Sequence, residues 1–368
     1  MKIHHLKLLN FRTYERLDID FGNYNIIYGN NGEGKTNLIE GIYVLALTKS
    51  FRGTVDKVLI MNNKDFTKIE GRIENEYLDD YKIVIKQNGK NVMINNNSIH
   101  KLSDYISKIN IVLFNPDDLK IIKDTPNTRR KNLNLDISQI DNSYLKNLNN
   151  YNKVLKQRNM YLKTMYYNGN KSANYLDVLT SKLVDLGKVI YESRKDFVYM
   201  VNDIIKDVYK SITGSDGLSI IFKSDYDGLN REELIDRYKE IQEKDIMFGK
   251  TNIGIHHDDI VFKINDKSIK DYGSEGQQKN AVIAYKFAVL NIFKKIKGTY
   301  PIFILDDLFS ELDRSKIDNI LNLIDDDVQT FITTTEIDKI KQQIVDKSKL
   351  IKISKGIIRE VNNYEGRV

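Results

Sequence analysis

Alternating apolar and polar residues open the chain. The runs between Ile3 and Phe21 repeat with a period of two, which predicts two half-buried strands. Tyr24–Tyr28 is a short run of mainly apolar residues, as in a strand buried on both faces, and residues 38–47 are apolar over a length that favours a helix. A later pair of runs, 81–85 and 91–94, is joined through Gln87-Asn88-Gly89 and predicts a hairpin.

The periodicity becomes helical after about residue 124. Apolar residues recur at alternating steps of three and four from 176 to 208, which predicts one long amphipathic helix. Leu148, Tyr151 and Leu155 mark an antiparallel partner helix, joined to the first through the polar segment 168–170. Asn230, with Glu233 three residues later, has the form of a capped helix start.

Short buried strands return in the last third of the chain. Residues 302–305 and 330–334 have the length and apolar character of strands in a parallel sheet. Strands therefore occur at both ends of the chain, and helices dominate its middle. We expect an α/β fold in which residues 1–122 and 248–368 form one discontinuous domain, with the mainly helical residues 123–247 inserted as an arm or lid.

Composition excludes several classes of protein. The 368 residues include no cysteine, which rules out disulfides, thiol catalysis and cysteine zinc sites. Charged residues interrupt the first twenty positions, and no run approaches the roughly 18 apolar residues that a membrane span requires. We therefore expect a cytoplasmic protein without a membrane segment.

Positive charge is concentrated in one part of the chain. The formal net charge is +6, yet residues 120–171 alone contain eleven Lys and Arg against three Asp. Tyrosines lie among these cations, a mixture typical of surfaces that contact phosphates and stack on bases. A solvated basic helix would have the same composition, and Arg129 and Arg130 could instead pair with acids. The candidate DNA contacts are Arg129, Arg130, Lys131, Lys153, Lys156 and Arg158.

A glycine-rich motif predicts a nucleotide site. The segment Gly29-Asn30-Asn31-Gly32-Glu33-Gly34-Lys35-Thr36 has the P-loop pattern and lies between the strand Tyr24–Tyr28 and a helix that starts near Asn37. Its glycines allow successive backbone N–H groups to face phosphates. Lys35 is expected to reach the β and γ phosphates of ATP, and Thr36 to coordinate Mg²⁺. Residues 29–37 are thus the predicted cofactor-binding segment.

Two adjacent acids follow the buried strand at 302–305. Asp306 is expected to hold Mg²⁺ through water, and Asp307 to orient or deprotonate the water that attacks the γ phosphate. ABC-type ATPases usually carry Glu at the second position. The shorter side chain of Asp307 therefore predicts slow turnover.

A third motif, Ser274-Glu275-Gly276-Gln277, has the S-x-G-Q form of the ABC and SMC signature. In that superfamily the signature of one subunit closes over the γ phosphate that the other subunit binds. By this resemblance Ser274, Gly276 and Gln277 imply a homodimer that forms on ATP. On its own, a Gly-Ser turn before a helix is more often a simple cap.

Taken together, these motifs resemble the RecF family. Asn10-Phe11-Arg12, Ser50-Phe51-Arg52 and residues 114–119 extend the match to nearly the whole chain. The resemblance implies an SMC-like ATPase head without a long coiled coil, which uses ATP and Mg²⁺ for weak, DNA-stimulated hydrolysis. It also implies binding of double- and single-stranded DNA, and work with RecR and RecO to load RecA at gaps and stalled forks.

The sequence departs from the family pattern at two places. Residues 254–259 read Gly-Ile-His-His-Asp-Asp where the family usually has Gly-Pro-His-Arg-Asp-Asp, so His257 could replace the arginine only weakly. The adjacent His256 and His257 suggest a metal site, but neighbours on one strand point to opposite faces, which favours a structural role. No glutamine matches the Q-loop of these ATPases, and Asn115 or Asp117 could serve there.

Other classes of protein share parts of this pattern. A nuclease-coupled ATPase would need a metal-dependent nuclease domain, for which the short segment after Asp307 leaves no room. A small-molecule kinase fits the P-loop but has no use for the motif at 274–277. A transport ATPase would need a membrane partner and gives the basic cluster no role.

Overall fold

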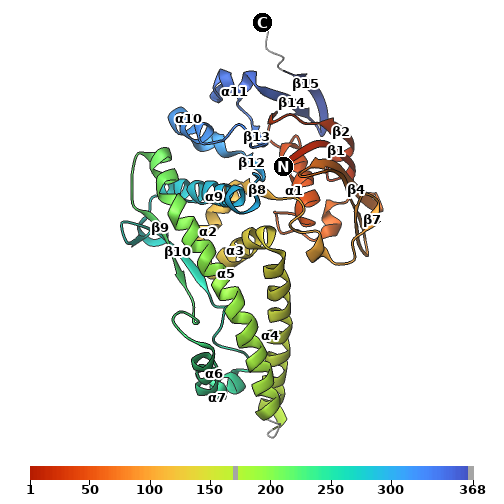
Figure 1. The fold of residues 1–368 in the computed structure, drawn as a ribbon. Coiled ribbons are helices and arrows are strands. Elements are labelled where there is room, and N and C mark those ends of the chain that lie inside the picture. Colours follow the sequence, from red (N-terminus) through yellow and green to blue (C-terminus); the bar gives the residue numbers. More distant parts are fainter. Residues whose placement is uncertain (169–172, 364–368) are drawn as a thin grey trace. The chain divides into compact units, whose positions relative to one another are not determined.

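The computed structural model describes residues 1–168 and 173–363, and these divide into two compact units (Figure 1). Unit 1 consists of Met1–Leu119, Asp207–Asp216 and the chain from Lys279 onward, and unit 2 of Lys120–Lys206 and Gly217–Gln278. Residues 248–278, expected to belong with the chain ends, lie in unit 2 because strand β10 (Asp259–Ile264) pairs with β9 (Leu218–Lys223). Residues 169 and 170 of the predicted link lie outside the described residues.

An antiparallel sheet forms one part of unit 1. Its strands, in the order β2-β1-β4-β5-β6-β7, are β2 (Tyr14–Asp20), β1 (Lys2–Phe11), β4 (Phe66–Glu74), β5 (Leu78–Lys86), β6 (Gly89–Ile94) and β7 (Asn97–Ser98). The predicted strands between Ile3 and Phe21 are confirmed, and buried and exposed side chains alternate from Leu17 to Phe21. The predicted hairpin is β5 with β6.

A mostly parallel sheet forms the other part of unit 1. Its strands, in the order β15-β14-β3-β13-β12-β8, are β15 (Ile357–Asn363), β14 (Ser348–Ser354), β3 (Tyr24–Tyr28), β13 (Thr330–Thr334), β12 (Ile302–Asp306) and β8 (Ile111–Phe114). Only β15 runs antiparallel to its neighbour. The three predicted apolar strands, β3, β12 and β13, lie side by side at its centre, so the carboxyl ends of β3 and β12 share one edge.

Helix α1 (Lys35–Leu47) lies between these two sheets. It contacts β1, β4 and β5 of the antiparallel sheet and β12 and β13 of the parallel sheet. A helix covered on both sides must be apolar around most of its circumference, and eleven of the 13 residues of α1 are buried. This burial fixes the start of α1, and hence the P-loop, relative to both sheets.

The remaining helices of unit 1 are shorter, apart from α9. Helix α9 (Glu275–Lys297) runs from the end of unit 2 into unit 1. The others are α10 (Arg314–Asn322), α11 (Gln342–Asp346) and the single-turn 3-10 helices η1 (Asp56–Leu59), η2 (Leu102–Asp104), η3 (Pro116–Leu119), η4 (Leu308–Glu311) and η5 (Ile337–Lys339).

Unit 2 is mainly helical. Its helices are α2 (Lys120–Lys123), α3 (Pro126–Ile140), α4 (Asn142–Asn168), α5 (Ala173–Thr213, up to Lys206), α6 (Arg231–Glu240), α7 (Gln242–Phe248) and α8 (Ile269–Tyr272). A small antiparallel sheet has the order β11-β10-β9, with β11 at Lys267–Ser268. The capping box predicted at Asn230 and Glu233 is present at the start of α6.

Helices α4 and α5 run antiparallel in unit 2 (Figure 1). Arg194 of α5 donates to the Tyr144 hydroxyl near the start of α4, whereas Arg158, further along α4, donates to Thr180 near the start of α5. The predicted pair of long helices is therefore confirmed.

Candidate functional site

The P-loop connects β3 to α1 at the carboxyl edge of the parallel sheet. Gly29, Gly32 and Gly34 all have positive φ angles, of 151°, 79° and 113°. A Cβ on Gly29 would lie 2.3 Å from the Ile353 carbonyl oxygen, so no side chain fits there. A Cβ on Gly32 would meet nothing within 4 Å, which leaves open space over the loop where phosphate groups could approach the backbone.

Lys35 lies across this loop. Its ammonium group donates to the carbonyl oxygens of Gly29 at 2.7 Å and Asn30 at 2.9 Å. Burial lowers the pKa of Lys35, and the negative charges of Asp307 and Asp306 partly oppose that effect. Bound phosphate oxygens would replace the two carbonyls as partners of the ammonium group, and their negative charge would balance its positive charge.

The rest of the loop is held by Glu33 and Asn37. The Glu33 carboxylate accepts the Asn30 backbone N–H at 2.8 Å, while Asn30, Asn31 and Gly32 are exposed. The Asn37 side chain donates to Thr13 at 3.0 Å. The predicted loop residues thus lie together, and the loop is open to solvent at Asn30, Asn31 and Gly32.

Asp306 lies beside the P-loop at the end of β12. It accepts hydrogen bonds from Thr333 of β13 at 2.6 Å and from Thr36 in the first turn of α1 at 3.3 Å. The side chain is almost fully buried, and this burial raises the pKa of Asp306. One carboxylate and a hydroxyl group, completed by phosphate oxygens and water, suit the ligand preference of Mg²⁺. The sequence interpretation missed Thr333, although its position at the end of a buried parallel strand was a usable signal.

Asp307 follows with a left-handed backbone conformation. Its φ angle is 51°, and its backbone N–H donates to the Thr333 hydroxyl at 2.9 Å. A positive φ is uncommon outside glycine and is costly unless neighbouring contacts hold it. The sharp turn therefore places Asp307 in a different environment from Asp306, which is buried.

A buried carboxylate, Glu40, organises the arginines near the P-loop. It is fully buried in α1 and accepts two hydrogen bonds from Arg12, at 2.9 and 2.7 Å, and one from Ser50 at 2.5 Å. Arg52 lies 3.5 Å from the same carboxylate, and its charge slightly opposes the rise in the pKa of Asp306 that burial causes. The motifs around Arg12 and Arg52 are therefore joined by a residue that the sequence interpretation did not single out. Its signal was a lone acid in an apolar helix.

Comparison with known proteins matches this geometry to one family. Residues 2–358 match the family described as RecF/RecN/SMC N terminal domain. The DNA replication and repair protein RecF of Oceanobacillus iheyensis is 36% identical over 369 residues, which cover 97% of this chain and all of that protein. That of Ligilactobacillus salivarius is 35% identical over 377 residues, with 99% of each chain covered. The chain belongs to the RecF family.

Solved structures agree with this assignment. A structure of the recombination mediator protein RecF-ATP in the RecFOR pathway has a TM-score of 0.88 at 28% identity, and the match covers 98% of this chain and 97% of that one. An Smc head domain from Pyrococcus furiosus has a TM-score of 0.56 at 18% identity, which shows a shared fold. The predicted fold class, an SMC-type ATPase head with an inserted helical region, is confirmed.

The signature motif of this RecF-family chain lies in unit 2, at the start of α9. The Ser274 backbone N–H donates to the Gln277 side chain at 2.9 Å, and the Gln277 N–H donates to the Ser274 hydroxyl at 3.2 Å. The motif therefore caps the helix, as the simpler interpretation held. Ser274, Gly276 and Gln277 are also exposed, and a Cβ on Gly276 would meet nothing within 4 Å. A role for them in a dimer stays a prediction.

Two of the predicted DNA contacts are wrong. Arg158 is 1% exposed and donates to Asp245 at 2.7 Å, and Arg129 is 7% exposed and donates twice to Asp259, at 2.6 and 2.9 Å. A buried guanidinium needs such partners, since leaving it unpaired costs several kcal/mol, on the order of 3–5. Neither side chain is available to DNA.

The other predicted DNA contacts are accessible. Lys131, Lys153 and Lys156 are exposed, and Arg130 is half-buried, with one N–H donated to the Asp258 carbonyl oxygen at 2.7 Å. Residues 131, 153 and 156 lie on α3 and α4.

The histidine pair does not lie on a strand. The His257 N–H donates to the Gly254 carbonyl oxygen at 2.8 Å in a turn, and β10 begins only at Asp259, so the expected strand geometry is wrong. Both ring nitrogens of His256 have partners, the Tyr151 hydroxyl and the Thr251 carbonyl oxygen, and burial lowers its pKa to about 4. Among the described residues, no group of three or more His, Cys, Asp or Glu could hold a metal ion.

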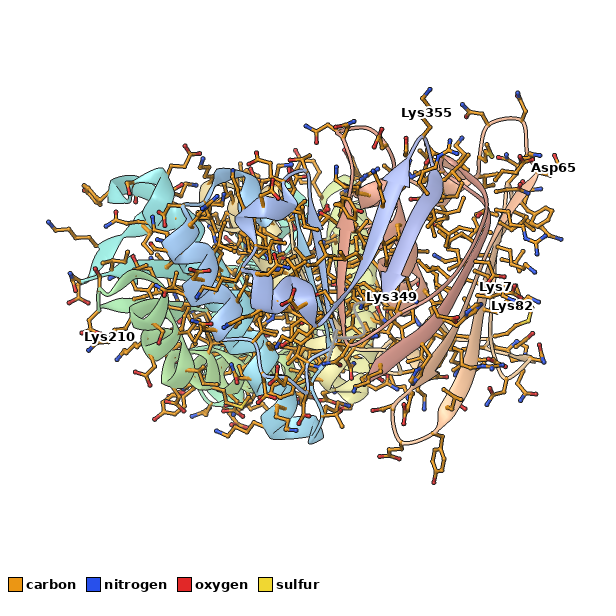
Figure 2. All side chains as sticks on the ribbon, turned by 90° about the horizontal axis from the view of Figure 1, so that it is seen from above. Lys7, Asp65, Lys82, Lys210, Lys349 and Lys355 are labelled. Atoms are coloured by element: carbon orange, nitrogen blue, oxygen red, sulfur yellow. The ribbon has the colours of Figure 1, made fainter. Side chains whose placement is uncertain are left out.

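The antiparallel sheet of unit 1 carries a cavity of about 530 Å³ on the face where Lys7 and Lys82 lie (Figure 2). Its charges pair with one another: Lys82 lies 3.3 Å from Glu70, and Arg72 lies 2.9 Å from Asp80. The cavity therefore offers little uncompensated charge to a ligand. Within residues 1–168 and 173–363, no helix has the length and apolar character needed to cross a membrane.

Proposed function

We propose that this RecF-family chain is an ATP-switched DNA-binding factor of recombination and repair. ATP binds with Mg²⁺ at the P-loop, two copies join around it, and hydrolysis separates them again. The observation that carries this proposal is the convergence of Thr36, Asp306 and Thr333 beside Lys35, at the edge of a parallel sheet. Such a cluster suits Mg²⁺-assisted attack on a γ phosphate.

Each part of the predicted site has a separate task in this proposal. Lys35 and the amides of residues 29–36 hold the phosphates, and Thr36 with Asp306 holds Mg²⁺. Asp307 positions the attacking water, and its short side chain keeps hydrolysis weak until DNA stimulates it. Ser274, Gly276 and Gln277 of one copy complete the site of the other.

DNA is the proposed macromolecular ligand. The exposed Lys153 and Lys156 lie on α4, and the exposed Tyr166 and Tyr167 lie near its end. Cations contact phosphates of either double- or single-stranded DNA, and tyrosine rings can stack on bases. Because a RecF structure with a TM-score of 0.88 to this chain is described as belonging to the RecFOR pathway, we further propose RecR and RecO as partners in loading RecA, in the cytoplasm.

Sedimentation of the purified protein tests this proposal. The protein is run with no nucleotide, ADP or ATP and Mg²⁺, each with and without duplex DNA at two salt concentrations. We expect a dimer only with ATP, and DNA binding that weakens steeply with salt. Lys35→Ala should remove both effects of ATP. A monomer that ignores nucleotide and DNA alike would instead favour the small-molecule kinase alternative.

A further inference from the structure

A polar pocket lies between α3 and α4 of unit 2. Its volume is about 230 Å³, several times the roughly 30 Å³ that one water molecule takes in the liquid. Helix α3 lines it with residues spaced one helical turn apart, and α4 closes the other side. The lining residues are Asn127, Arg130, Lys131 and Asn134 of α3, Leu148 and Asn152 of α4, and Arg194, Ile255 and His256.

The pocket carries positive charge that no lining residue compensates. None of its lining side chains is a carboxylate. Arg194 is balanced by Asp258 at 2.6 Å, with both side chains almost fully buried. No ion pair is recorded within the described residues for Arg130 or Lys131. Burial lowers the pKa of Arg130, and the nearby charge of Arg194 adds to this effect. The carboxylates of Asp259 and Asp258, which are not part of the pocket lining, only partly oppose the fall.

The pocket also presents oriented hydrogen-bond donors. The Asn134 side-chain oxygen accepts from Arg194 at 2.9 Å and from the Tyr144 hydroxyl at 2.6 Å, so its amide N–H groups face away from these donors. Arg130 uses one N–H on the Asp258 carbonyl and keeps others for a ligand. His256 stays neutral near pH 7, since its pKa is about 4. Positive charge, free donors and no carboxylate are the properties of an anion site.

We infer that this pocket binds a phosphate group. The planar guanidinium of Arg130 can donate two parallel hydrogen bonds to phosphate oxygens, and Lys131 adds a point charge at the exposed side. A backbone phosphate of DNA is the source that fits best, and this choice of source rests on the proposed function. The pocket would then fix the position of one phosphate, while Lys153 and Lys156 add diffuse attraction.

Two charge-matched variants test the inference in the full chain with ATP. Asn152→Asp places a carboxylate in the pocket. Asn150→Asp makes the same change at an exposed position of α4 that is not part of the pocket lining and lies about 200° away around the helix. Both sites are exposed, so both variants should fold, and thermal unfolding checks this. Duplex DNA affinity is measured over a range of salt, and inorganic phosphate alone is titrated separately.

We expect Asn152→Asp to weaken duplex binding about tenfold or more and to reduce the slope of log affinity against log salt by about one, as for one lost phosphate contact. Asn150→Asp should change the affinity by less than about threefold. If phosphate binding alone is lost in Asn152→Asp and DNA binding is not, the pocket takes free phosphate. Equal behaviour of the two variants in both titrations would overturn the pocket, and the proposed function would stand as long as the wild type binds DNA.

Discussion

Asp306 and Asp307 are adjacent in sequence, yet the fold gives them different chemistry. Asp306 accepts hydrogen bonds from Thr333 and Thr36 and is 4% exposed, so its carboxylate is fixed and shielded from water. Asp307 has a left-handed backbone and is less buried. A fixed carboxylate suits a metal ligand, whereas one beyond the strand end suits a group that orients water.

Replacing Asp307 by Asn should therefore separate ATP binding from hydrolysis. The amide cannot accept a proton, so single-turnover hydrolysis should fall by roughly a hundredfold or more, the usual contribution of a general base. ATP affinity should change little. Rapid-quench hydrolysis and equilibrium nucleotide binding measure the two effects.

Asp65→Asn is the matched control, because this exposed carboxylate lies at the edge of unit 1 (Figure 2). It should hydrolyse ATP at the wild-type rate. An Asp307→Asn protein with normal single-turnover hydrolysis would remove Asp307 from its proposed role.

At the residue scale, contiguous motifs could be predicted from the sequence better than the partners that surround each side chain. The P-loop was predictable because its glycines, lysine and threonine are contiguous. The partners of Glu40 are Arg12, Ser50 and Arg52, which no local pattern connects. The assignment of Arg158 to DNA failed for a related reason. Clustered charge in a sequence does not reveal that Arg158 is buried in an ion pair with Asp245, which lies far along the chain.

At the scale of elements, one buried ion pair connects the end of β8 with helix α9. Lys286 of α9 lies 3.3 Å from Asp118 of η3, and their side chains are 8% and 12% exposed. Asp118 also accepts the backbone N–H of Asn115, at the end of β8. Burial raises the pKa of Asp118, and Lys286 opposes that rise. Because β8 pairs with β12, the ion pair ties α9 to the edge that carries Asp306.

We expect Lys286→Met to destabilise unit 1, because it leaves Asp118 buried without its cation. Breaking such a pair typically costs about 3–5 kcal/mol, and the residual exposure here places the effect at or below that range. Asp118→Asn in the same chain should recover part of the loss, since an amide can still accept the Asn115 N–H. Chemical denaturation of the two single variants and the double variant measures the coupling. Strictly additive losses would show that the two residues do not interact.

The elements themselves follow closely from periodicity. Period-two alternation identified β1 and β2, uninterrupted apolar runs identified β3, β12 and β13, and the helical stripe identified α5. The segment before Asp259 was predicted as strand because its sequence offered no turn signal except Gly254, whose φ of 129° begins the turn. Short-range turn geometry depends on tertiary contacts such as that between His256 and Tyr151.

At the scale of the molecule, the chain passes between the two units several times. The expected boundary at residue 248 assumed that strands belong with strands. Residues 259–264 instead pair with 218–223 inside unit 2, a long-range choice that alternation alone cannot reveal. As a result, the P-loop lies in unit 1 and the signature Ser274 lies in unit 2, although α9 carries the chain from one into the other.

The proposed ATP-dependent dimer is the property to test at this scale. Ser274→Arg places a bulky cation at an exposed position, so ATP should still bind at the P-loop while the ATP-dependent dimer is lost. Ser274→Thr keeps the hydroxyl that caps α9 and should dimerise.

Mixing two defective proteins gives the sharpest form of this prediction. Lys35→Ala cannot hold ATP but has an intact signature, and Ser274→Arg holds ATP but lacks one. If each site is completed by the partner's signature, the mixture contains one complete site, formed by the P-loop of the Ser274→Arg copy and the signature of the Lys35→Ala copy. Sedimentation with ATP and a label on one variant should then detect a heterodimer that neither protein forms alone. If the signature acts within its own subunit, no complete site exists in the mixture and both proteins stay monomeric.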